Sequence, residues 1–129
     1  MEANNPRPSA RRKAYNCLGR QETFRLAQHI VQDQKRYLEP YLTLETLAEE
    51  LNVHRNILSA AVNHYAGVIF PVWIATYRIA EVERLASLPE NSRASIETLA
   101  LKAGFANRTS FYRVYRSIKH SKPSETLKK

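Results

Sequence analysis

Residues 107–122 place side chains suited to contacting nucleic acid at helical spacing. An arginine near the start of a helix can hydrogen-bond to the O6 and N7 atoms of guanine, and a threonine can meet a thymine methyl group or a polar base edge. We therefore predict base contacts for Arg108, Thr109 and Tyr112. Ordinary solvated arginines would give the same local pattern, so this prediction depends on the fold that presents them.

The other polar and basic residues of this stretch suit the phosphate backbone. Lys and Arg side chains bind phosphate and make the affinity salt-dependent, but these contacts carry no sequence information. The predicted phosphate contacts are Asn107, Ser110, Arg113, Arg116, Lys119 and Lys122.

Residues 54–63 form a second, less charged set. Asn can bond to the N6 and N7 atoms of adenine, Ser can donate or accept, and Ala can touch a thymine methyl group. Arg55 is the one formal charge, so we expect this stretch to bind DNA more weakly; its polar residues could also be a neutral surface. The predicted base contacts are Asn56, Ser59, Ala60 and Asn63, and the predicted phosphate contacts are His54 and Arg55.

The elements that would position these residues are pairs of short helices. An apolar stripe over residues 44–51 stops at Asn52, which favours a left-handed turn, and a second stripe follows over residues 57–62. Thr43 suits the N-cap of the first helix, but Thr46 in place of Glu or Gln predicts no full capping box. Two short helices joined by a tight turn are typical of a helix-turn-helix.

The same pattern recurs later in the chain. Leu99, Ala100, Ala103, Gly104 and Phe105 stand 52 residues beyond Leu47, Ala48, Leu51, Asn52 and Val53. Gly104 takes the turn position, where glycine has no Cβ penalty. The repeat predicts two helix-turn-helix units, and it is more specific than either unit alone.

A long helix is predicted between the two units. Apolar residues recur at helical spacing after Pro71, which suits a first turn, and a helix of about 17 residues would be about 25 Å long. We expect Phe70, Trp73 and Tyr77 to be core residues, and Arg78 to be structural, paired with a glutamate of the first unit.

The sequence therefore predicts an all-α protein in four parts. Residues 1–20 are a basic arm or linker, and a helical pattern then runs from Gln21 to Pro40. The first helix-turn-helix subdomain spans residues 21–68, the connecting helix residues 69–88, and the second subdomain with its basic tail residues 89–129.

Composition limits the functions that this chain could have. Of the net charge of +8, the segment 102–129 carries +7, with eight Lys or Arg and one Glu, which indicates a polyanionic partner. One cysteine excludes an internal disulfide, the four histidines lack metal-ligand spacing, and we find no catalytic constellation. We predict no enzyme activity, no metal, no cofactor, no membrane span and a cytoplasmic location.

The sequence resembles the DNA-binding domain of the AraC/XylS family of bacterial transcription regulators over residues 22–126. The resemblance is carried by "YLTLETLAEELNVHRNILS", "FPVWIATYRIAEVERL", "SIETLALKAGFANRTSFYRVYR" and the final Pro-Ser. It implies about seven helices and binding to two successive major-groove segments of double-stranded DNA, with Asn56, Ser59 and Ala60 facing bases. His120 stands where the family usually has glycine. RNA polymerase is a further candidate partner.

Two alternatives remain open at the level of the sequence. The chain leaves no room for the separate sensing or dimerising domain that the family typically carries, so we expect a stand-alone small member or a C-terminal piece. The weakly charged first unit is also compatible with a helical adaptor of the same fold that binds an acidic protein partner.

Overall fold

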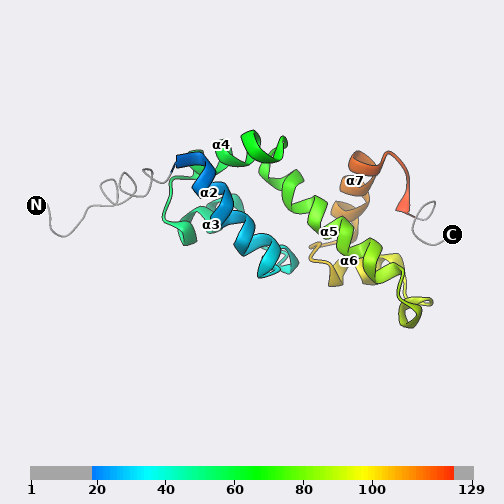
Figure 1. Ribbon diagram of the computed structural model, residues 1–129. Helices are drawn as coiled ribbons and strands as arrows, with labels where there is room; N and C mark the ends of the chain where they lie inside the picture. Colours follow the sequence, from blue (N-terminus) through cyan, green and yellow to red (C-terminus); the bar gives the residue numbers. More distant parts are fainter. Residues whose placement is uncertain (1–18, 124–129) are drawn as a thin grey trace, which may run out of the picture. The chain divides into compact units, whose positions relative to one another are not determined.

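The computed structural model describes residues 19–123, and this part of the chain is all-helical, as predicted (Figure 1). It holds six α-helices and no strand in that range. The α-helices are α2 (Gly19–Gln28), α3 (Leu44–Leu51), α4 (Arg55–Ala66), α5 (Phe70–Ala86), α6 (Ile96–Lys102) and α7 (Arg108–Lys119). Shorter helical turns are η1 (His29–Asp33), η2 (Arg36–Leu38) and η3 (Pro89–Asn91). Most of the predicted arm and the residues after Pro123 lie outside the described residues.

The helices form two compact units. The first unit consists of residues 19–34 and 42–73, and the second of residues 35–41 and 74–123, within the part that the structure describes. Helix α5 has the predicted length of 17 residues and contributes to both units. The segment 35–41, which we call the strap, belongs to the second unit although its neighbours in sequence on both sides belong to the first.

The helical region before Pro40 is broken, and the prediction of a single element from Gln21 was wrong. Helix α2 already begins at Gly19 and passes into the π-helical turn η1. The chain then leaves the helix at Lys35, which adopts a left-handed conformation with φ 57°, and resumes as the 3-10 turn η2. A left-handed residue reverses the local path of the chain, so the apolar positions on either side cannot share one helical stripe.

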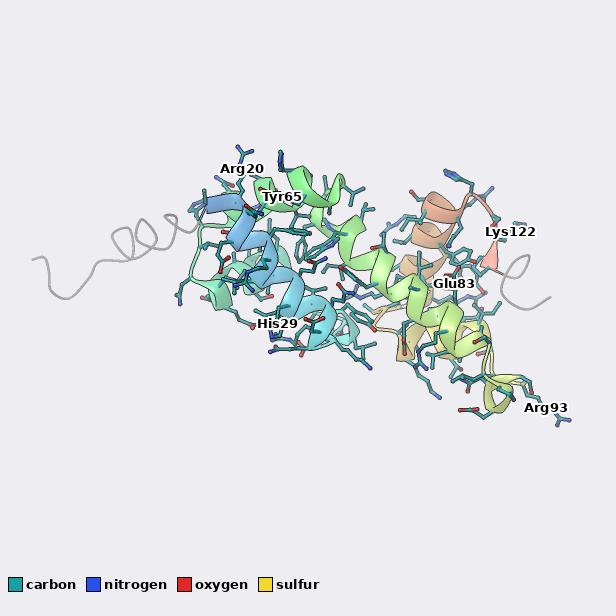
Figure 2. The ribbon with its side chains drawn as sticks, viewed as in Figure 1. Arg20, His29, Tyr65, Glu83, Arg93 and Lys122 are labelled. Atoms are coloured by element: carbon teal, nitrogen blue, oxygen red, sulfur yellow. The ribbon has the colours of Figure 1, made fainter. Side chains whose placement is uncertain are left out.

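In the first unit, α2 covers the helix-turn-helix pair α3 and α4 (Figure 1). Phe24 of α2 stacks on Tyr65 of α4 with the ring centres 5.5 Å apart, and it lies 5.3 Å from the ring of Trp73. Tyr65 is labelled beside α2 in Figure 2. The predicted stripes face inward: the buried residues here include Leu47, Ala48, Leu58, Ala61 and Val62.

Both ends of α3 are fixed by local geometry. Asn52 ends the helix in the predicted left-handed conformation, with φ 59°. At the other end Thr43 accepts from the Thr46 N–H at 3.1 Å, and Thr46 Oγ1 accepts from the Thr43 N–H at 3.0 Å. A full capping box is therefore present, and our prediction that none forms was wrong, because a threonine hydroxyl can fill the role usually taken by Glu.

The second unit has its own apolar core. This core consists of residues from α5, α6, α7 and the turn between α6 and α7. Figure 1 shows α6 and α7 beside the later part of α5. The fully buried members include Val82, Leu99, Ala103, Phe111 and Tyr115. Gly104 has a φ of +105°, as the predicted turn requires, and Phe105 next to it packs edge-to-face on Phe111.

No single helix within residues 19–123 has the length and apolar character needed to cross a membrane. One bent pair, Arg55–Ala66 with Phe70–Ala86, satisfies the requirement by length and composition alone.

Candidate nucleic-acid interface

Helix α4 presents the weaker set of predicted contacts. Leu58 and Ala61 are fully buried on its inner face, while Arg55, Asn56 and Asn63 are exposed. Ser59 and Ala60 are half-buried. The predicted base-contacting residues thus lie on the accessible part of the helix.

His54 has a local structural role that the sequence did not reveal. Its Nδ1 atom accepts a hydrogen bond of 3.0 Å from the backbone N–H of Asn56, so the imidazole caps α4. A cap at this position satisfies one of the free N–H groups at the helix start. His54 therefore fixes where the helix begins, whatever it contacts besides.

Helix α7 presents the richer set. Phe111 and Tyr115 are buried on one side, as predicted, and Val114 is half-buried. Asn107 caps the helix, with its Oδ1 atom accepting from the Ser110 N–H at 2.8 Å. The exposed residues are Asn107, Arg108, Thr109, Arg113, Arg116, Lys119 and Lys122, while Ser110 and Tyr112 are half-buried.

A hollow of about 270 Å³ opens at the side of α7. Its lining consists of Tyr112, Arg113, Arg116, Lys122 and Pro123. Pro123 is fully buried and holds the end of the described chain against the helix. Three of the five lining residues are Lys or Arg, which are the residue types that bind an anion such as phosphate.

The C-terminal end of α7 is shaped by two contacts. His120 takes the left-handed conformation, φ 60°, and its N–H bonds to the carbonyl of Arg116, so it does what glycine usually does at this position. Lys119 Nζ lies 2.9 Å from Oε2 of Glu83 on α5. Glu83 is labelled in Figure 2. Lys119, a predicted phosphate contact, is thus paired with a carboxylate in this structure.

A protein-family model described as a helix-turn-helix domain matches residues 47–129. The chain belongs to the AraC-type helix-turn-helix family. The match begins inside α3 and includes α4 and α7. No curated protein and no solved structure gave a significant match. As a member of this AraC-type family, which is not a family of enzymes, the chain is a DNA-binding domain of the kind used in transcription regulation.

Arg78 has partners in this AraC-type domain that differ from the predicted ones. We expected a glutamate of the predicted first subdomain, residues 21–68, and one partner, Glu39, does lie there, but it is contacted through its backbone carbonyl. Arg78 Nε donates to the carbonyl oxygen of Tyr37 and Arg78 Nη2 to that of Glu39, both at 2.7 Å. Burial lowers the pKa of the Arg78 guanidinium, and its carbon lies 5.9 Å from the centre of the Phe105 ring. Arg78 therefore fixes the strap to α5.

Glu97 of α6 is a site residue that sequence reasoning missed. Its Oε2 atom accepts a hydrogen bond from the Tyr112 hydroxyl and lies 3.7 Å from Arg108 Nε. The Arg108 guanidinium in turn lies over the Tyr112 ring, 5.6 Å from its centre. The Tyr112 hydrogen bond, followed by the Glu97 backbone N–H and the charge of Arg108, lowers the pKa of Glu97. The same hydrogen bond, together with burial, raises the pKa of Tyr112.

The repeat in the sequence contained a signal for this contact. Glu45 and Glu97 are both the second residue of the first helix of their helix-turn-helix, α3 and α6, and they stand 52 residues apart. In the first unit Glu45 Oε2 lies 3.3 Å from Nη2 of Arg55, the first residue of α4. A glutamate paired with the arginine that opens the second helix of the helix-turn-helix is therefore common to both units.

Proposed function

We propose that the chain recognises a specific DNA sequence and regulates transcription, with α4 and α7 entering successive major-groove segments. The hollow beside α7 carries the DNA-binding part of this proposal, because its lining combines Arg113 and Arg116 of α7 with Lys122, which follows the helix. Phosphate contacts of this kind fix the register of a helix in the groove without selecting a sequence.

Sequence selection is assigned to the exposed residues near the start of each recognition helix. In α7, Arg108 is proposed for a guanine edge and Thr109 for a neighbouring base, with Tyr112 one turn further along. In α4, Asn56, Ser59, Ala60 and Asn63 are proposed to contact bases, with few charges to add affinity. We therefore expect the half-site bound by α7 to be the better defined one.

Binding to two segments is supported by the repeat and by α5. Each helix-turn-helix contains a short helix with buried apolar residues, a left-handed turn residue and a second helix with exposed residues. Helix α5 has 17 residues, about 26 Å at 1.5 Å per residue, which is comparable to the ~34 Å turn of B-DNA. A single chain could then cover two half-sites.

Selection from random duplexes tests this proposal. The chain should enrich a consensus with two half-sites about 10 bp apart, centre to centre. Recovery of no consensus, even at low salt, would overturn it and would favour a helical adaptor for an acidic protein. A consensus with one half-site would retain DNA recognition and reject the two-segment arrangement.

A further inference from the structure

We propose that Glu97 is a specificity-determining residue: its carboxylate, held by Tyr112, positions Arg108 for a base edge and disfavours its use on phosphate. This inference rests on the proposed function, in which Arg108 contacts a guanine. Glu97 lies on α6, outside the recognition helix. Its negative charge is repelled by DNA phosphates, so simple electrostatic attraction to DNA does not explain its presence.

Three side chains from two helices meet at this point. Arg108 and Tyr112 are four residues apart on α7, so they share one face of the helix. Glu97 extends from α6, and its Oε2 atom accepts a hydrogen bond from the Tyr112 hydroxyl and lies 3.7 Å from Arg108 Nε. The side chain of Arg108 is 73% exposed and that of Glu97 only 35%, so the carboxylate is anchored while the guanidinium projects outward.

The chemistry of arginine explains what such an arrangement achieves. The guanidinium carries five N–H donors in a planar fork, and a guanine edge needs two of them. The closest approach to Glu97 is made through Nε, at 3.7 Å, and we assign the base contact to the terminal nitrogen atoms. Contacts with Glu97 and with the Tyr112 ring also reduce the rotamers that free Arg108 can adopt, so less conformational entropy is lost on binding.

The negative charge adds discrimination. A phosphate that approaches Arg108 competes with the Glu97 carboxylate and is repelled by it, whereas a neutral guanine edge is not. Glu97 should therefore weaken binding to random DNA more than binding to the correct site. Its benefit is a higher ratio between the two affinities, and its cost is a lower absolute affinity.

The first unit offers an internal comparison. Glu45 and Arg55 occupy the corresponding positions, but Ser59 stands where the second unit has Tyr112, one turn into the helix. Without a tyrosine to hold the carboxylate, the Glu45 side chain is 57% exposed, against 35% for Glu97. The pair thus recurs in both units, and the anchored form is found in the unit with the stronger base-contact candidates.

The experiment uses the sites recovered by selection and the full chain. Dissociation constants are measured for the selected duplex, for duplexes altered at each α7 base pair, and for a random duplex. Glu97→Gln keeps the shape and an acceptor oxygen, and it should bind the random duplex several-fold more tightly while losing about fivefold or more of the discrimination at one base pair. Glu97→Asp keeps the charge but shortens the reach, so it should lose discrimination with unchanged random binding.

The matched control is Glu22→Gln, which removes the same charge from an arginine-paired glutamate on α2. It should alter the specific and random affinities by the same factor. If Glu97→Gln behaves like this control, or if both Glu97 variants keep the parent's discrimination, the inference is wrong while the proposed function stands. If no consensus is selected at all, the proposed function itself has failed. Circular dichroism confirms that each variant is folded.

Discussion

Arg78 Nε donates a hydrogen bond of 2.7 Å to the carbonyl oxygen of Tyr37, which lies 41 residues earlier in the chain. Gly104 approaches the same segment from the turn of the second helix-turn-helix. A Cβ atom at Gly104 would collide with the Tyr37 carbonyl oxygen and would lie 2.9 Å from Leu38 Cα and 3.0 Å from Arg78 Nε. The strap, the long helix and the second turn therefore meet in one tightly packed contact.

The first prediction concerns this contact. Gly104→Ala should destabilise the second unit by about 3 kcal/mol, because a positive φ penalises a Cβ and the new methyl group meets backbone that cannot move aside easily. Urea denaturation would measure the free energy of unfolding. The matched control is Gly67→Ala: Gly67 also has a positive φ, +76°, but nothing lies within 4 Å of its Cβ position, so only about 1 kcal/mol is expected. Equal losses in the two variants would show that the strap does not constrain position 104.

Arg78 itself allows a second prediction. Arg78→Ala should lower the free energy of unfolding by about 2 kcal/mol, since the carbonyl groups of Tyr37 and Glu39 lose a charged donor. Arg78→Lys should recover only part of this, because a single ammonium group does not reproduce the planar fork that serves two carbonyl groups. Full recovery by lysine would mean that charge alone, rather than the two hydrogen bonds, accounts for the stabilisation.

The third prediction separates phosphate contacts from base contacts. Arg113→Ala should weaken binding to all duplexes about equally and reduce the slope of log K against log salt by roughly one. Fluorescence anisotropy over a salt series measures this slope. Arg93→Ala is the control: it removes the same charge from the exposed loop between η3 and α6, away from α7 (Figure 2). An unchanged slope for Arg113→Ala would exclude this arginine from the phosphate contacts.

The fourth prediction is a pH dependence of stability. The lowered pKa of Glu97 means that its contribution is complete above the ordinary glutamate value, about 4.3, and is lost as the pH falls through the folded-state value. The raised pKa of Tyr112 means that its contribution is complete below about 10 and is lost as the pH rises through the folded-state value. Both shifts depend on their shared hydrogen bond.

Tyr112→Phe tests that assignment. The difference in unfolding free energy between parent and variant should be largest near neutral pH and should shrink toward both pH extremes. On the acid side part of the dependence should remain in the variant, because the Glu97 backbone N–H and Arg108 also lower the pKa of Glu97. A difference that is constant with pH would mean that the hydroxyl does not stabilise the Glu97 carboxylate in solution.

The features that could be predicted from the sequence are those set by local rules. The turns at Asn52 and Gly104 follow from which residues tolerate a left-handed backbone, and the length of α5 follows from apolar spacing between Pro71 and Pro89. The burial of Phe111 and Tyr115 follows from the same spacing. Each of these depends on a few neighbouring residues.

The features that were missed depend on residues far apart in sequence or on an unusual local substitution. Tyr37 and Arg78 are separated by 41 residues, so no pattern predicts that a backbone carbonyl replaces a glutamate as the partner. Lys35 is not a residue type that marks a left-handed break, and Thr46 is not the usual member of a capping box. The contact of Glu97 with Arg108 does have a signal in the repeat, because Glu45 and Glu97 occupy equivalent positions in the two helix-turn-helix units.

The assignment of the strap to the second unit has a practical consequence for dissecting the protein. A single cut in the gene at the boundary within α5, between residues 73 and 74, separates residues 35–41 from the rest of the second unit. A fragment that starts at α5 would expose the groups around Arg78 and Gly104 to water. Adding residues 35–41 as a separate peptide, or joining them through a short engineered linker, should restore the contacts with Arg78 and Gly104. The two units alternate along the chain, so a gene for the second unit alone must have its segments rearranged and not only be shortened.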